Sequence, residues 1–190
     1  MVQELDQVVS IPGQRRNTMS RLCLLLIVAM LALFTGSLVA AAQSNPITLD
    51  SKTDYVSVKK VILISADMMP AENYSFRTTP QVRTFGELVA HVADAQIAIC
   101  SVAKGESKSG NAKGKTSKAD LVAALKTSFD YCDPVYDSMT DASGAQMVKL
   151  FGNDRTKLGV LFFNNTHDNE TYGTMVAYLR IRGLVPPGRH

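Results

Sequence analysis

Apolar residues recur at intervals of three and four positions in four stretches of the chain, the spacing that places side chains on one face of an α-helix. These stretches span residues 51–69, 84–104, 117–139 and 154–181. Between them there is no convincing alternation of apolar and polar positions, which would indicate a strand. The pattern predicts an all-α fold, a four-helix bundle in which side chains on facing helices build any site.

The ends of these helices carry recognisable signals. The segment Thr84-Phe-Gly-Glu87 is a capping box, in which the threonine hydroxyl accepts the third backbone amide and the glutamate side chain reaches back. Pro70 ends the first helix, and Gly183, followed by a proline pair, ends the last. Pro134 lies inside the third stretch, where we expect it to kink the helix or end it early.

The connections between the helices differ in composition. Residues 71–80 contain proline, asparagine and serine, and Tyr74 and Phe76 are expected to anchor this connection against the bundle. Residues 105–116 contain three glycines and several lysines. They predict a flexible, solvated loop rather than a phosphate-binding patch. Residues 140–152 are expected to form a polar link.

The N-terminal part of the chain has the pattern of an export signal. Three arginines precede an apolar run at residues 22–34, and the small residues Ala40–Ala42 follow. This pattern predicts a signal peptide over residues 1–42, cleaved to leave a domain of residues 43–190 in the periplasm or outside the cell. The alternative is a retained anchor, because residues 22–42 carry no charge and are long enough to span a bilayer.

Composition limits the partners of the domain that remains after cleavage. Its 148 residues are close to the usual size of a single domain. Its 17 basic and 15 acidic residues give a net charge of +2. A balance so near neutral gives no support for binding to nucleic acid or to an anionic membrane. A small molecule and a second copy of the chain remain as candidate partners.

The cysteines allow a conditional prediction. Cys23 leaves with the predicted signal peptide, so Cys100 and Cys132 remain in an oxidising compartment, where disulfides form. Cys100 lies 16 residues beyond Thr84, and Cys132 lies 15 residues beyond Ser117. If the second and third helices are parallel and start at one level, the two sulfurs lie at the same height and form a disulfide. If the helices are antiparallel, several turns separate the cysteines and no bond forms.

Four short segments carry a family resemblance. They are Met69–Arg77, Thr79–His91, the pair Tyr172-Gly and the ending at residues 182–187. Together they resemble the DinB-like family of bacterial four-helix bundles, over residues 47–187. The resemblance implies a bundle of the DinB-like type with a divalent-metal site, for zinc or nickel. In that family one histidine ligand comes from the second helix, and two come from a H-x-x-x-H pair on the fourth.

The resemblance places the metal site at His91, His167 and Thr171, with a threonine where the pattern has its third histidine. A threonine hydroxyl is a much poorer ligand for zinc or nickel than an imidazole. Asp168 and Glu170 do not replace it, because consecutive helical positions point about 100° apart. The expected site is therefore degraded. A native catalytic metal, a weakly held metal and no metal all remain open.

Three functions from different classes are consistent with these residues, one of them a scaffold that dimerises through the outer faces of its helices. The first is an exported DinB-like bundle with a degraded three-histidine metal site and a binding or structural role. The second is a divalent-metal-dependent thiol S-transferase, or a related metal-dependent enzyme, in which the metal would lower the pKa of a bound thiol. The missing ligand and the predicted export both count against the enzyme.

Overall fold

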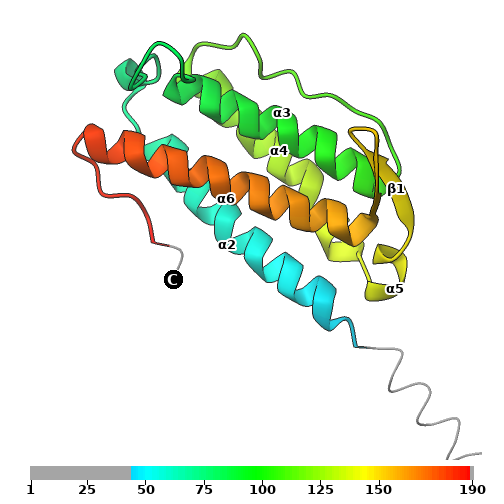
Figure 1. Ribbon diagram of the computed structural model, residues 1–190. Helices are drawn as coiled ribbons and strands as arrows, with labels where there is room; N and C mark the ends of the chain where they lie inside the picture. The colour runs from blue at the N-terminus through cyan, green and yellow to red at the C-terminus, as the bar shows by residue number, and fades with distance from the viewer. Residues whose placement is uncertain (1–43, 189–190) are drawn as a thin grey trace, which may run out of the picture. The chain divides into compact units, whose positions relative to one another are not determined.

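The computed structural model describes residues 44–188. The predicted signal peptide, its cleavage point after Ala42, and His190 lie outside the described residues. Four long helices make up most of the described chain (Figure 1). They are α2 (Pro46–Met68), α3 (Phe85–Lys104), α4 (Lys118–Ser138) and α6 (Lys157–Ile181). The prediction of an all-α bundle is confirmed.

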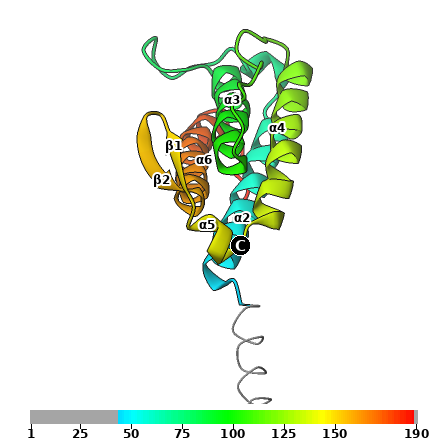
Figure 2. The ribbon, with the colours of Figure 1, turned by 90° about the vertical axis from the view of Figure 1, so that its right-hand side faces the viewer.

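The second and third of these helices are parallel. From the end of α3, residues 105–117 run back along the bundle to the start of α4 (Figures 1 and 2). Hydrogen bonds record this return, because the Lys108 amide reaches Ser101 and the Ala112 amide reaches Asp94, nearly two turns earlier in α3. Helices α2 and α6 run in the opposite direction, so the bundle has one long crossover connection.

The first helix begins earlier than the periodicity predicts. It starts at Pro46 rather than at residue 51. The carboxylate of Asp141, in the short helix α5 (Asp141–Gly144), accepts hydrogen bonds from the amides of Ile47 and Thr48. A residue more than 90 positions away therefore satisfies first-turn amides of α2, which normally lack an intrahelical partner.

The expectation of no strand is wrong at one place. Strands β1 (Met147–Leu150) and β2 (Asn153–Thr156) form a small antiparallel hairpin within and just after the predicted polar link. The turn residues Phe151 and Gly152 both have positive φ angles, 50° and 81°. Leu150 is the only fully buried side chain of the two strands. Strands with so little buried surface produce no clear alternation in the sequence. Helix α6 consequently begins at Lys157.

Pro134 does not end the third helix early. Helix α4 continues to Ser138, close to its predicted end. A proline removes one backbone donor and crowds the preceding turn. Pro134 and Asp130, four residues earlier, are exposed, so water can reach the carbonyl that loses its partner. Val135 and Tyr136 are buried and hold the last turn against the bundle.

The core lies between the four helices and contains large aromatic side chains. The rings of Tyr55 and Tyr136 stack with centroids 3.8 Å apart. Tyr74 is buried and its hydroxyl donates to the Ala66 carbonyl, as expected for an anchor of the connection that follows α2. Within residues 44–188, α3 is the one helix long and apolar enough to cross a membrane. Most of it is buried inside the bundle, so its apolarity reflects its place in the core.

Candidate functional site

Two histidines from distant parts of the chain meet on the facing sides of α3 and α6. The Nε2 atoms of His91 and His167 are 2.9 Å apart, and their ring centroids are 4.8 Å apart. At this distance one imidazole donates a hydrogen bond and the other accepts it. The sequence placed both residues in one site, and the structure brings their side chains together.

Thr171 lies one helical turn after His167 and is buried. Its hydroxyl donates a hydrogen bond to the His167 carbonyl at 3.0 Å, a common arrangement for threonine inside a helix. The side chain therefore directs its proton to its own helix. The residue that stands in the third ligand position of the family pattern offers only a neutral oxygen to the histidine pair.

The nearby carboxylates have other partners. Asp94 accepts the amides of Ala112 and Lys113 at 2.7 and 2.9 Å. Glu87 accepts the Thr84 amide at 2.7 Å, which completes the predicted capping box. Within residues 44–188, no group of three His, Cys, Asp or Glu side chains could hold a metal ion. The residues present therefore do not fit a three-histidine centre.

The electrostatic setting favours neutral imidazole at His91. Burial lowers the pKa of His91, and the nearby Arg83 guanidinium and His167 lower it further. Asp168, next to His167 on α6, is completely buried, and this burial raises the pKa of its carboxyl to about 6. Its Oδ1 atom lies 3.5 Å from His167 Nδ1, which opposes the effect of burial. A completely buried carboxyl group thus lies next to the His167 ring of the histidine pair.

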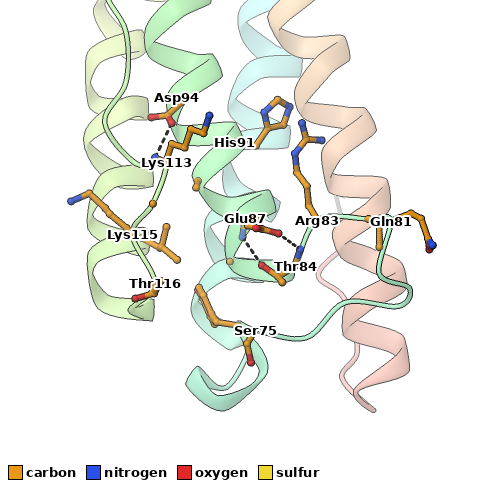
Figure 3. A pocket seen from close by; sticks show the side chains of 16 residues that line it. Ser75, Gln81, Arg83, Thr84, Glu87, His91, Asp94, Lys113, Lys115 and Thr116 are labelled. Carbon is orange, nitrogen blue, oxygen red and sulfur yellow. Dashed lines mark hydrogen bonds between the residues drawn. The ribbon is translucent and has the colours of Figure 1, made fainter.

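A cleft of about 930 Å³ opens beside His91 (Figure 3). Its walls are the N-terminal half of α3, the connection before it and the crossover loop. Tyr74, Ala90 and Leu121 contribute buried apolar surface. Arg83 lies in the wall, and Figure 3 shows its side chain extending toward the His91 ring. His91 thus lies where the histidine pair meets the cleft.

Comparison with known proteins identifies the family of the chain and supports its fold. The sequence profile of the DinB superfamily matches residues 58–175. The chain belongs to the DinB superfamily. Two similar crystal structures are DinB-like proteins from Bacillus cereus and Bacillus subtilis, each with a TM-score of 0.62 and 21% identity. They cover 74% and 77% of this chain, which spans 94% and 98% of theirs. No curated protein is significantly similar to the chain.

This DinB-superfamily protein has a buried polar network behind the histidines that sequence reasoning missed. Gln96 donates from Nε2 to Asp168 at 2.6 Å and accepts at Oε1 from Asn164 at 2.8 Å. Asn164 also donates to the Tyr136 hydroxyl. Gln96, Asn164 and Asp168 are fully buried. A glutamine among the apolar residues of a predicted core helix was the available signal, because buried polar groups need partners.

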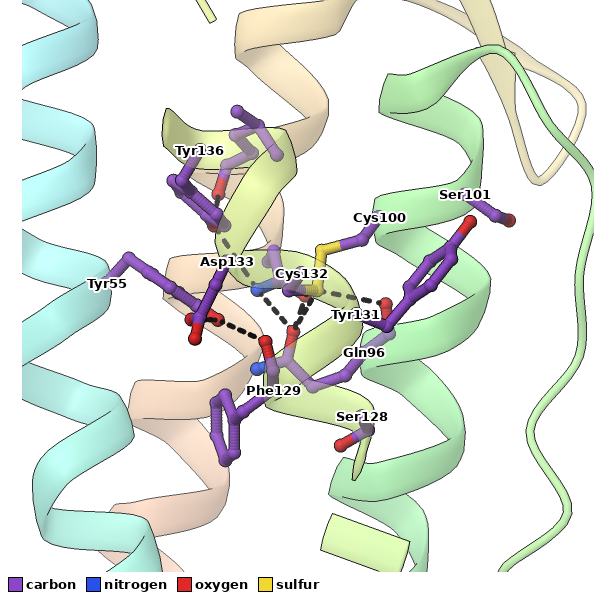
Figure 4. Close-up of a disulfide and its surroundings, with 12 residues drawn as sticks. Tyr55, Gln96, Cys100, Ser101, Ser128, Phe129, Tyr131, Cys132, Asp133 and Tyr136 are labelled. Carbon is purple, nitrogen blue, oxygen red and sulfur yellow. Dashed lines mark hydrogen bonds between the residues drawn. A yellow bond between two sulfur atoms is a disulfide. The ribbon is translucent and has the colours of Figure 1, made fainter. Parts of the chain in front are cut away.

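The predicted disulfide is confirmed. Cys100 and Cys132 are bonded, with Cα atoms 5.5 Å apart, and both side chains are buried. Figure 4 shows the bridge between α3 and α4, with Gln96 beside it. Gln96 Oε1 lies 3.0 Å from Cys132 Sγ, so the bridge and the polar network are in direct contact. The parallel arrangement of α3 and α4 meets the geometric condition on which the prediction depended.

Proposed function

We propose that this chain is an exported DinB-superfamily protein whose metal site is reduced to a histidine pair, and which binds a small molecule without metal catalysis. The observation that carries the proposal is the pairing of His91 Nε2 with His167 Nε2 while Thr171 donates to its own helix. The two nitrogen atoms that would bind a metal form a hydrogen bond with each other instead. The third position supplies a weak ligand.

A binding role also requires a place for a ligand. The cleft beside His91 has the volume typical of small-molecule sites, roughly 300–1,000 Å³. It combines apolar walls with a few polar and charged groups, as such sites do. Export is part of the proposal because of the arginines, the apolar run and the small residues at the N-terminus.

The competing proposal is the metal-dependent thiol transferase, and one observation favours it. Tetrahedral zinc at roughly 2.0–2.1 Å would hold two nitrogen atoms about 3.3 Å apart, whereas an ion with ligands at right angles, such as nickel, would hold them about 2.9 Å apart. The Nε2 atoms of His91 and His167 show this separation. The same distance describes a hydrogen bond, so metal titration has to decide between the two proposals.

The test is calorimetric titration of tag-free wild type, Thr171→His and Thr171→His/His91→Ala with zinc and with nickel. We expect weak or substoichiometric binding by wild type and one tightly bound ion in Thr171→His, which supplies a third imidazole one turn from His167. The double variant should lose that gain. Metal should also stabilise Thr171→His against heat, by about 2.7 kcal/mol at a hundredfold excess over Kd.

Two results would count against the proposed function. Tight stoichiometric binding by wild type would support the metal-dependent enzyme in place of the binding protein. If Thr171→His gains no affinity, the side chain at position 171 does not face the histidine pair, and the missing ligand is not what weakens metal binding.

A further inference from the structure

We propose that the cleft beside His91 binds a small organic anion, a carboxylate or phosphate monoester, whose charge is held mainly by Arg83 and Lys113. The inference rests on the proposed function, since it names the class of molecule that such a binding protein would take. It depends on which charged side chains of the cleft have partners within the protein and which have none.

The lysines of the crossover region fall into two groups. Lys104 and Lys108 form ion pairs with Glu106, at 2.7 and 2.8 Å. Lys118 donates to the Asp67 carbonyl. None of these three lysines lines the cleft. These three lysines therefore interact with other groups of the protein and do not contribute to binding in the cleft.

The other two lysines of this region, Lys113 and Lys115, both line the cleft. Within residues 44–188 neither forms an ion pair, and the same holds for Arg83 on the opposite wall. Three cations thus face or border one cavity without a carboxylate partner. The expectation of a purely solvated lysine loop is incomplete, because the unpaired lysines are those at the cleft.

The two carboxylates of the cleft form no ion pair with these cations among residues 44–188. Glu87 is bound to the Thr84 amide, and this hydrogen bond lowers the pKa of Glu87, which the nearby charge of Arg83 lowers further. Asp94 receives two loop amides. Both carboxylates direct oxygen atoms to backbone donors, so Arg83 and Lys113 remain without a carboxylate that pairs with them among residues 44–188.

The loop that carries Lys113 is held in place despite its glycines. Asp94 binds the amide of Lys113 itself and that of Ala112, which is buried. Gly110 packs so closely that a Cβ there would lie 2.1 Å from Asp94 Oδ1. The backbone beneath Lys113 is therefore fixed before a ligand arrives, which reduces the entropy cost of binding.

The side chains of Arg83 and Lys113 flank the strip of α3 that carries Glu87 and His91, whereas Lys115 points outward (Figure 3). The same strip also has two small residues, Gly86 and Ala90, beside these polar side chains. Ala90 is 7% exposed, and a Cβ on Gly86 would lie 3.1 Å from the Tyr74 carbonyl. A surface of this kind suits the carbon body of a ligand better than a bare inorganic ion. Arg83 can bind a carboxylate or phosphate through two parallel hydrogen bonds.

The experiment is a titration of the mature protein with benzoate, phenyl phosphate, inorganic phosphate and the neutral isostere benzamide, followed by amide chemical shifts. Benzoate or phenyl phosphate should give saturable shifts in residues 82–91 and 112–115. Benzamide and inorganic phosphate should bind at least tenfold more weakly. The two organic anions separate carboxylate from phosphate recognition.

The variant Arg83→Ala/Lys113→Ala should weaken binding of the preferred anion at least tenfold. The matched control Lys60→Ala/Lys126→Ala removes two exposed lysines that do not line the cleft, and it should bind as wild type does. All four substituted side chains are exposed, so circular dichroism should show both variants folded.

The inference is overturned if neither organic anion saturates, if benzamide binds equally well, or if the control loses as much affinity as the cleft variant. Zinc titration of the same samples separates this result from the proposed function. Tight metal binding with anion binding intact would overturn the metal-free role alone. Weak metal binding without anion binding would overturn the anion site alone.

Discussion

Individual side chains explain why the site departs from a three-histidine centre. Thr171 occupies a position one turn from His167, and a threonine there supplies no third nitrogen. The threonine hydroxyl donates to the helix backbone instead. Asp168 is adjacent in sequence to His167 but is completely buried beneath the pair. Neighbouring residues on one helix thus have different roles because the helix turns by about 100° per residue.

Asp168 makes stability depend on pH. Burial raises the pKa of its carboxyl to about 6 in the folded protein, above the ordinary value of 3.8, so the folded state binds this proton more tightly than the unfolded state. The stabilising contribution is complete below about pH 4 and is lost as pH rises through about 6. In Asp168→Asn that loss is absent, and asparagine can still accept the Gln96 hydrogen bond.

We therefore expect the free energy of unfolding of Asp168→Asn, relative to wild type, to rise by about 3 kcal/mol between about pH 4 and pH 7. Urea unfolding of both proteins across this range measures the difference directly, and changes common to both proteins cancel. Parallel curves would show that the carboxyl titrates normally in the folded state.

The sequence predicts the roles of residues whose partners lie only a few positions away. The Thr84 cap and the reach of Glu87 follow from a four-residue pattern, and the structure contains both hydrogen bonds. Gln96 could not be predicted as a central residue in the same way. Its partners are Asp168 and Asn164, about 70 positions away, and only the packing of α3 against α6 brings them together.

The sequence predicts helices and caps correctly where the stabilising contacts join residues a few positions apart. It fails where an element is stabilised by residues distant in sequence. The start of α2 depends on Asp141, and the hairpin has one fully buried side chain, so neither produces a periodic signal. The crossover loop resembles a flexible segment in composition, with glycines at three positions. It is instead fastened to α3 through Asp94.

The role of Asp94 can be tested at the level of this loop. Asp94→Ala removes two charge-assisted hydrogen bonds, each worth about 1.5–3 kcal/mol. Amide hydrogen exchange at Ala112 and Lys113 should therefore become roughly 10- to 100-fold faster. Exchange in the core of α6 should change little, because the loss is local.

The control for that experiment is Asp130→Ala, which removes the same charge from an exposed position on α4. Exchange at Ala112 and Lys113 should stay at the wild-type rate in this variant. Equal acceleration in both variants would mean that the loop responds to net charge. No acceleration in Asp94→Ala would mean that other contacts hold the loop.

At the scale of the whole domain, residues 44–188 form a bundle with two parallel neighbours, α3 and α4, and a disulfide between the C-terminal halves of these two helices. The Cys100–Cys132 disulfide closes a segment with a sequence separation of 32, which includes the entire crossover loop. A link of this kind restricts the unfolded chain. Its position next to Gln96 also ties the bridge to the network behind the histidine pair. Stability and the shape of the site therefore depend on the same contact.

Removing the bridge in Cys100→Ala/Cys132→Ala should lower the free energy of unfolding by about 3–4 kcal/mol, the entropic contribution expected for a loop of this length. Urea unfolding with and without dithiothreitol measures the loss. The double variant serves as its own control, because reductant should destabilise wild type and leave the variant unchanged. Both sulfurs are buried, so native wild type should resist reduction until denaturant opens the bundle. Two reactive thiols in unreduced, denatured mature wild type, or a variant within about 1 kcal/mol of wild type, would contradict a stabilising bridge.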